Sequence, residues 1–109
     1  MSAFAEIVER LAAVVEARKG ADPSSSYTAK LLADGPLRVA KKLGEEAVET
    51  VLAAASGDKQ AIAAESADLI YHWLVLLAAT GVTLDDVAEA LKAREGRSGI
   101  EEKASRKGA

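Results

Sequence analysis

Hydrophobic residues recur every three or four positions along the N-terminal segment, where they would form one stripe on a helix: Phe4, Ile7, Val8, Leu11, Val14 and Val15. Similar spacing, interrupted by glycine, proline and capping residues, divides the rest of the chain. We expect helices over residues 2–18, 27–33, 36–55, 58–80 and 83–94. No segment alternates with the period of a strand, so the predicted fold class is all-α, a compact bundle of four to five helices.

Local chemistry supports these boundaries. Pro36 suits the first position of a helix, and Thr83 with Asp86 has the spacing of a capping box. Gly57 and Gly81 are typical stop signals. Gly44 lies inside an expected helix, where glycine costs about 1 kcal/mol relative to alanine. We therefore expect another helix to pack closely against Gly44.

The segment 58–80 is apolar on nearly every face of the expected helix. Its polar exceptions, Glu65, Asp68 and His72, fall at positions i, i+3 and i+7 and form one stripe. A helix that is hydrophobic on most faces is usually buried. Buried carboxylates are costly without a partner, so we expect a cation or a basic group to face them.

Length and composition indicate a single domain over residues 1–109, with a charged tail from about residue 96 that is expected to be extended or only partly helical. Half of the residues are hydrophobic, but many of these are alanine, and only four residues are aromatic. Such a chain buries little surface alone, so we expect a homodimer or a higher homo-oligomer. The absence of cysteine excludes disulfides and thiolate metal sites.

Charge and hydropathy bear on the cellular location and on the classes of partner that we expect. A formal net charge of −3 argues against a nucleic-acid surface. The N-terminal stripe is interleaved with Glu6 and Glu9, unlike a signal peptide, and the longest apolar run, residues 73–79, is far shorter than a membrane span. We expect a cytoplasmic protein with no membrane partner.

Five carboxylates in two blocks are the main candidates for chemistry. Glu45, Glu46 and Glu49 form the first block and, after fifteen intervening residues, Glu65 and Asp68 form the second. Within a block, residues three or four apart share a helix face, so two antiparallel helices could bring both blocks into one volume. Crowded carboxylates repel unless a cation holds them, and oxygen ligands suit Mg²⁺ or Mn²⁺. A magnesium site in turn suggests phosphate chemistry.

Basic residues precede the first acidic block on the same expected helix. Arg38, Lys41 and Lys42 lie near its N-terminus, which reverses the charge order that the helix dipole prefers by about 0.3–1 kcal/mol per charge. On this helix, a basic segment that could bind phosphate would lie beside an acidic segment that could bind a metal ion.

Four segments make a family resemblance specific. The pattern Glu46-x-x-Glu49 with Glu65-x-x-Asp68 resembles the ExxE…ExxD signature of the all-α nucleotide pyrophosphohydrolases, the MazG-type superfamily. The segments 26–35 (SYTAKLLADG), 41–49 (KKLGEEAVE), 68–72 (DLIYH) and 97–106 (RSGIEEKASR) are similar to the phosphoribosyl-ATP pyrophosphatase family. The resemblance covers most of the chain.

The resemblance implies hydrolysis of phosphoribosyl-ATP to phosphoribosyl-AMP and pyrophosphate, the second step of histidine biosynthesis. It implies Mg²⁺, with Mn²⁺ as a substitute, held by Glu46, Glu49, Glu65 and Asp68. Glu45 and Glu46 are the candidate catalytic residues, Glu45 to orient the attacking water or to act as base. Pyrophosphate is a multiply charged leaving group, and the candidate substrate-binding cations are Arg38, Lys41, Lys42, Arg94, Arg97, Lys103 and Arg106. A two-fold dimer with active sites near its interface is also implied.

Other interpretations stay open at this level. A related enzyme acting on dUTP, dCTP or non-standard nucleotides would show the same acidic pattern, and a non-catalytic helical module could use an acidic face to bind a basic partner. A lone histidine such as His72 is more often a hydrogen-bonded core residue than a substrate contact. Residues Ser24, Ser25, Ser26 and Thr28 could bind phosphate or cap a helix.

Overall fold

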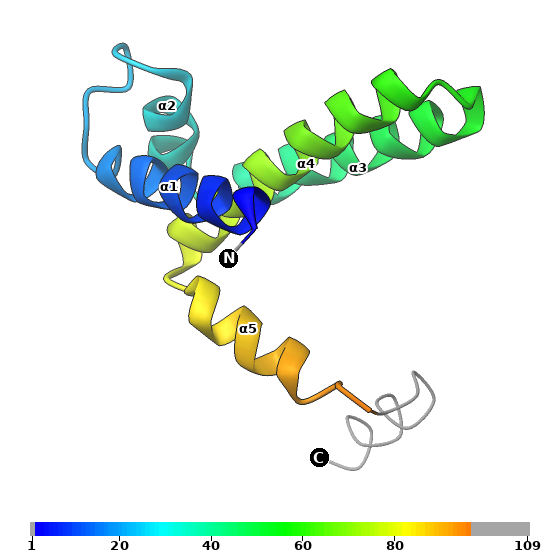
Figure 1. The fold of residues 1–109 in the computed structure, drawn as a ribbon. Coiled ribbons are helices and arrows are strands. Elements are labelled where there is room, and N and C mark those ends of the chain that lie inside the picture. The colour runs from blue at the N-terminus through cyan, green and yellow to red at the C-terminus, as the bar shows by residue number, and fades with distance from the viewer. Residues whose placement is uncertain (1, 97–109) are drawn as a thin grey trace.

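A computed structural model describes residues 2–96 of the protein (Figure 1). Over this range it contains no strand, and its five helices are α1 (Ala3–Ala17), α2 (Tyr27–Asp34), α3 (Pro36–Ser56), α4 (Lys59–Thr80) and α5 (Leu84–Lys92). Each helix lies where the sequence predicts one, and its ends differ from the prediction by at most two residues. The all-α fold class is therefore confirmed.

Side-chain caps explain why the boundaries were readable from sequence. The Ser2 hydroxyl accepts a hydrogen bond from the Ala5 amide at 3.2 Å at the start of α1. Thr83 and Asp86 form the reciprocal bonds of a capping box at the start of α5. Gly57 and Gly81 end α3 and α4 with left-handed backbone angles (φ 74° and 78°), which glycine adopts without a Cβ penalty.

Helices α3 and α4 form an antiparallel hairpin that projects from the rest of the molecule as an arm (Figure 1). Helices α1 and α2 pack at the base of this arm, where four helices each contribute one almost fully buried side chain: Val15, Leu31, Val39 and Val75. Apolar burial at this junction is the main source of stability within the single chain. The hydrophobic core thus lies at one end of the arm and does not run along it.

The described chain by itself is an open bundle, and the two-fold dimer that we expect to complete it stays a prediction. The radius of gyration is 15.9 Å, whereas a compact domain of this length has about 13 Å. Helix α5 leaves the C-terminal end of α4 and extends away from the core (Figure 1). The physical reason is that the outer faces of the arm and of α5 find no partner helix among the described residues.

The expected burial of the 58–80 helix is found in only one part of α4 in the single chain. The buried residues of α4 all lie in its C-terminal part: His72, Leu74, Val75, Leu77 and Ala78. In the N-terminal part, which belongs to the arm, Glu65 is half-buried and Asp68 is exposed. These carboxylates therefore keep contact with water in the single chain.

One face of α3 is apolar and exposed. Leu37 exposes 88 % of its surface, and Val48, Val51 and Leu52 expose 57 %, 66 % and 57 %. Gly44 lies on the same helix, and a Cβ added to it would meet nothing within 4 Å. The expected close packing of a helix against Gly44 is therefore absent within the described chain.

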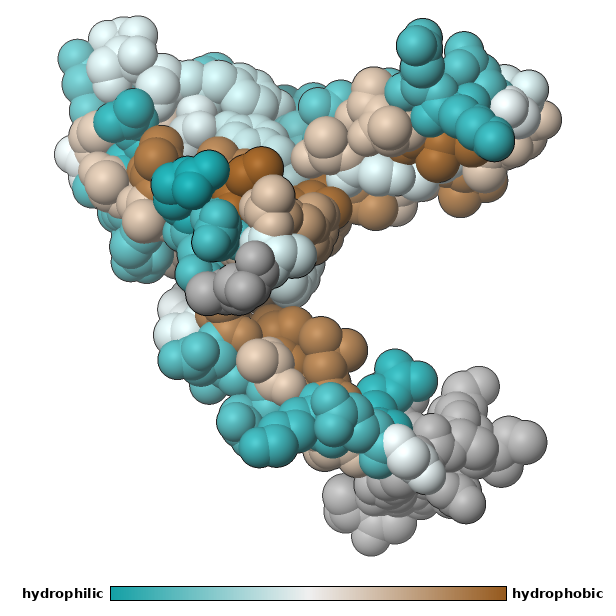
Figure 2. Space-filling view, viewed as in Figure 1, coloured by the Kyte–Doolittle hydropathy of each residue, from teal (hydrophilic) through white to brown (hydrophobic). Residues whose placement is uncertain are grey.

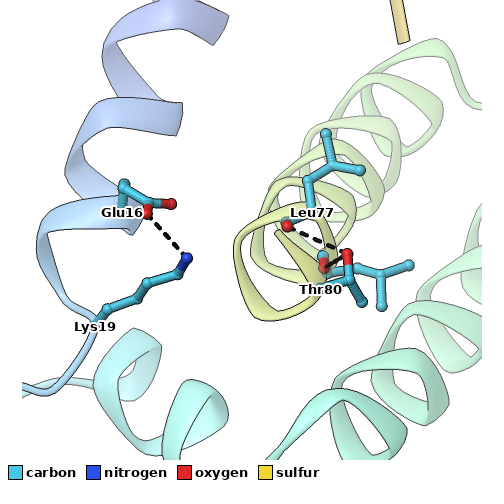
Figure 3. Close-up of polar contacts among 5 residues, drawn as sticks. Glu16, Lys19, Leu77 and Thr80 are labelled. Atoms are coloured by element: carbon cyan, nitrogen blue, oxygen red, sulfur yellow. Dashed lines mark hydrogen bonds and ion pairs between the residues drawn. The ribbon is translucent and has the colours of Figure 1, made fainter. Parts of the chain in front are cut away.

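The C-terminal end of α4 lies beside the C-terminal end of α1 (Figure 3). The Glu16 and Lys19 side chains form an ion pair of 2.9 Å there, and the Thr80 hydroxyl bonds the carbonyl oxygens of Leu76 and Leu77 at 2.8 and 3.2 Å. A largely apolar groove of about 430 Å³ lies between this end of α1, the end of α4 and the start of α5. The groove is remote from the acidic blocks.

Helix α4 is the one helix within residues 2–96 whose length and composition would suffice to cross a membrane. Core helices of water-soluble proteins meet the same criteria, and the C-terminal part of α4 packs against α1 and α2. The feature is therefore weak evidence for a membrane span.

Candidate metal and phosphate site

The structure brings the two acidic blocks together on the arm. Glu46 of α3 and Glu65 and Asp68 of α4 each offer a carboxylate oxygen, and these three oxygens lie within 4.8 Å of one another. Glu45 and Glu49 line the same open pocket of about 540 Å³. All five carboxylates that the sequence singles out therefore meet in one place, because the two helices run antiparallel and each presents an i, i+3 pair.

A threonine missed by the sequence analysis joins the two helices at this point. The Thr50 hydroxyl lies 2.9 Å from the carbonyl oxygen of Glu46 and 3.3 Å from that of Glu65. Since carbonyl oxygens only accept, the hydroxyl is the donor in both contacts. Thr50 follows Glu46 by four residues, so it lies on the same face of α3, and that spacing was the available signal.

Electrostatic crowding is visible at Glu65. Partial burial raises the pKa of its carboxyl group, and the neighbouring charges of Asp68, Glu46 and Glu49 raise it further. Each of these effects disfavours the charged form, and a bound cation would remove the repulsion. The donors are carboxylate oxygens only, which is the ligand type that Mg²⁺ and Mn²⁺ prefer. The residues present therefore fit a hard divalent cation.

Of the basic side chains predicted to bind substrate, only some lie near the acidic pocket. Lys42 lines the acidic pocket, and its ammonium lies 3.4 Å from a Glu45 carboxylate oxygen. Arg38 and Lys41 are exposed on α3 but do not line the pocket, and Arg94 is exposed just after α5, away from the arm. The remaining candidates, Arg97, Lys103 and Arg106, lie outside the described residues.

His72 is a core residue, as expected. It exposes 6 % of its surface, and its Nδ1 lies 2.7 Å from the Asp68 carbonyl oxygen. A carbonyl only accepts, so Nδ1 holds the hydrogen; the other nitrogen, Nε2, then accepts from the Tyr27 hydroxyl at 3.2 Å. Both ring nitrogens are used, which leaves neither free for a metal or a substrate.

The serine-rich segment before α2 includes one clear cap. The Ser26 hydroxyl accepts from the Ala29 amide at 3.0 Å, so capping is its structural role. The Thr28 hydroxyl contacts that of Tyr71 across to α4. Tyr27 and this inter-helix contact were not singled out by the sequence, because only the tertiary structure brings α2 beside the middle of α4.

Comparison with known proteins identifies the family of the chain. The family model described as "Phosphoribosyl-ATP pyrophosphohydrolase" matches residues 8–95. The chain is 69 % identical to phosphoribosyl-ATP pyrophosphatase of Caulobacter vibrioides (strain NA1000 / CB15N), over 93 % of this chain and 94 % of that protein. It is 65 % identical to that of Caulobacter sp. (strain K31), over 97 % and 98 % of the two chains.

A third relative, phosphoribosyl-ATP pyrophosphatase of Cereibacter sphaeroides (strain ATCC 17029 / ATH 2.4.9), is 62 % identical over 92 % of this chain and 97 % of that protein. The match to the family model spans both acidic blocks, helices α2 to α5 and the larger part of α1. The resemblance that the sequence motifs predicted is thereby confirmed. The chain belongs to the phosphoribosyl-ATP pyrophosphohydrolase family, whose members are hydrolases acting on a diphosphate bond.

Proposed function

We propose that the acidic pocket on the arm is the active site in which this hydrolase converts phosphoribosyl-ATP to phosphoribosyl-AMP and pyrophosphate in a Mg²⁺-dependent reaction. The step is the second of histidine biosynthesis, and the proposed location is the cytoplasm. The observation that supports the site is the convergence of three carboxylate oxygens from two helices within 4.8 Å.

The roles follow from the positions of the side chains. Glu46, Glu65 and Asp68 would hold Mg²⁺, or Mn²⁺ as a substitute, with Glu49 beside them in the pocket lining. When bound, such an ion neutralises charge on phosphate oxygens and lowers the pKa of a coordinated water. The cluster thus serves both the binding of the triphosphate and the attack of water at phosphorus.

Glu45 is the proposed residue for orienting or deprotonating the attacking water. Its carboxylate lines the pocket but is not one of the three clustered ligands, so it is available for a water molecule. Lys42, paired with Glu45 at 3.4 Å, would orient this carboxylate and meet the charge on the phosphates. Glu46 contributes to catalysis as a metal ligand.

The protein is proposed to act as a homodimer. The exposed stripe of Leu37, Val48, Val51 and Leu52 is apolar surface that a second copy would remove from water. The open side of Gly44 would allow a helix to approach closely. Figure 2 also shows hydrophobic residues on the sides of α5 and of the arm that face each other.

A dimer would also explain the distribution of basic residues. Arg38, Lys41 and Arg94 lie outside the pocket of their own chain, and a second copy packed on the arm could supply such groups to the pyrophosphate. Arg97, Lys103 and Arg106 belong to the same proposed set. Because the arm has the acidic pocket and the apolar stripe on one hairpin, the active site would lie near the interface.

The dimer can be tested by sedimentation of Val51→Lys, which places a charge in the apolar stripe. We expect the wild type to sediment as a dimer and the variant as a monomer. Val14→Lys introduces the same change at an exposed position of α1 and should leave the dimer intact. A wild type that is monomeric at micromolar concentration would contradict the proposal.

The activity itself is tested with purified protein and phosphoribosyl-ATP. Pyrophosphate release is expected with Mg²⁺ and should disappear with excess EDTA, while dUTP, dCTP and ATP run in parallel are expected to turn over far more slowly. Preferred turnover of another nucleotide would keep the chemistry but change the substrate. A folded, Mg²⁺-supplemented protein that hydrolyses none of them would contradict the proposed function.

A further inference from the structure

An aromatic cluster connects the start of α2 to the middle of α4. The rings of Tyr27 and Tyr71 stack with centroids 6.4 Å apart and planes inclined by 26°. The imidazole of His72 contacts both rings edge-on, at 6.0 Å and 4.9 Å between centroids. The stack uses two of the four aromatic residues in the whole chain.

Hydrogen bonds hold this cluster in one arrangement. The Tyr27 hydroxyl donates to His72 Nε2 at 3.2 Å, and His72 in turn donates from Nδ1 to the Asp68 carbonyl oxygen at 2.7 Å. The hydroxyls of Thr28 and Tyr71 are bonded to each other beside them. The Tyr27 ring is therefore held on two sides before any ligand arrives, which reduces the side-chain entropy that binding would cost.

Despite these contacts, Tyr27 is half exposed. It leaves 51 % of its surface in water, whereas Tyr71 is partly buried and His72 is buried. Its hydroxyl is bonded to His72 and its ring stacks on Tyr71, so the exposed part includes ring surface. A flat aromatic surface that is rigid and exposed is a ready stacking platform.

The two residues of α4 that hold Tyr27 lie one helical turn beyond the acidic pocket. Tyr71 and His72 follow Asp68 by three and four residues, so they occupy the next turn on the same helix face, about 5–6 Å away between Cβ atoms. A nucleotide separates its base from its phosphates by one ribose. A ligand whose phosphates enter the acidic pocket could therefore extend its base one turn further along α4, toward Tyr27.

We propose that the exposed face of Tyr27 binds the purine ring of the substrate by stacking, while the phosphates occupy the acidic pocket. This inference rests on the proposed function and adds to it a site for the base. Stacking suits the site because the hydroxyls and the imidazole around Tyr27 are already bonded to one another. His72 and Thr28 are then positioning residues, which hold the two rings without touching the substrate.

The test compares Tyr27→Leu with Tyr27→Phe in the full-length enzyme. Loss of a base–aromatic stack should raise KM for phosphoribosyl-ATP roughly 5- to 100-fold, with kcat and the Mg²⁺ concentration for half-activation changed less than about threefold. Tyr27→Phe keeps the ring and should retain most of the affinity. Phe4→Leu removes an exposed ring on α1 that contributes neither to the acidic pocket nor to the aromatic cluster, and should leave KM unchanged.

Two inhibitors separate the base from the phosphates. ATP and inorganic tripolyphosphate share the three phosphates, and only ATP has a purine. Tyr27→Leu should weaken inhibition by ATP roughly 5- to 100-fold and leave inhibition by tripolyphosphate unchanged. In the wild type, ATP with Mg²⁺ should shift the NMR signals of the Tyr27 ring protons and tripolyphosphate should not, a readout that does not depend on the variant folding.

The opposite results would overturn the inference. These are an unchanged KM in a folded Tyr27→Leu, an equal rise in KM for Tyr27→Phe, or no shift of the Tyr27 ring signals with ATP. Conversion of Tyr27→Leu from dimer to monomer in sedimentation would show that a second copy covers the ring instead. Failure of the proposed function is distinct, because the wild type would then not hydrolyse phosphoribosyl-ATP at all.

Discussion

The two halves of α4 have opposite surroundings. Leu74 and Val75 in the C-terminal half pack in the core, with exposed fractions of 2 % and 0 %, while the N-terminal half lies on the arm with Glu65 half-buried and Asp68 exposed. A charge in the first environment would cost several kcal/mol, whereas carboxylates in the second keep contact with water and largely avoid that cost. A single helix thus contributes stability at one end and ligands at the other.

The acidic cluster therefore depends little on the hydrophobic core of its own chain. Among residues 2–96, the arm is held by the α3–α4 contact and by the Thr50 hydroxyl, and no surrounding layer of helices covers it. Substitutions on the arm should therefore affect activity without affecting folding, and substitutions at its base should do the reverse.

The largest expected effect is that of Asp68→Asn on turnover. Removing one carboxylate from the proposed metal cluster should lower kcat/KM by roughly 10³-fold, which corresponds to about 4 kcal/mol. The helical content and Tm should stay close to those of the wild type, because Asp68 is exposed. Steady-state kinetics measure the loss of turnover, and thermal melts measure Tm. A variant that keeps wild-type turnover would show that Asp68 is not part of the active site.

At the base of the arm the expected effect is on folding. Val75→Ala deletes two methyl groups from a fully buried position and should lower the free energy of unfolding by about 2 kcal/mol. Val14→Ala makes the same change at a 48 % exposed position of α1 and should cost less than about 0.5 kcal/mol. Urea denaturation measures both, and equal losses would contradict the division between core and surface.

Mg²⁺ should raise the thermal stability of the protein, because an ion that binds only the folded state shifts the folding equilibrium toward it. A ligand that binds only the folded state at ten times its Kd adds about 1.4 kcal/mol, which would raise Tm by roughly 5–10 °C. Choline chloride at equal ionic strength is the control for a general salt effect. Glu65→Gln should lose most of the Mg²⁺-dependent rise, and a rise of the same size in this variant would place the ion elsewhere.

The smallest expected effect is a pH dependence from Glu65. Its pKa in the folded metal-free protein is raised above the ordinary value of 4.5, first by partial burial and then by Asp68, Glu46 and Glu49. The folded state therefore binds the proton more tightly than the unfolded chain, so stability should fall as pH rises from 4.5 through the raised pKa. Chemical denaturation with EDTA at each pH measures this slope.

Two comparisons identify the source of that slope. Glu65→Gln should flatten it, because the variant has no titrating group at this position. The pKa of Asp86 is lowered from 3.8 by its bonds to Thr83, so its contribution is lost only as pH falls below that value. A slope of the opposite sign above pH 4.5 in the wild type would contradict the assignment to Glu65.

Much of the local structure and of the site could be predicted. Capping chemistry at Thr83 and Asp86 and glycine stops at Gly57 and Gly81 act within a few residues, so they set helix ends without help from the rest of the fold. The i, i+3 spacing within each acidic block likewise determines a shared helix face. The convergence of the five carboxylates followed once the two helices paired antiparallel.

The differences from expectation share one physical reason. Burial of the 58–80 helix was inferred from its apolar faces and close packing at Gly44 from the cost of a glycine inside a helix, and neither signal specifies which helix covers that surface. Thr50 and Tyr27 were missed because their contacts cross between helices, from 15 to 45 residues apart in the chain.

The five helices, the approximate positions of their ends, the acidic residues of the site and the family could be read from the sequence, because each depends on side chains a few residues apart or on a motif. The three-dimensional arrangement was needed to show that α4 is buried at one end and hydrated at the other, that Thr50 joins the two acidic helices, and that Tyr27 lies half exposed beside the turn of α4 that follows Asp68. Burial and contacts across helices depend on which faces meet in space, and periodicity along one helix does not specify its partner.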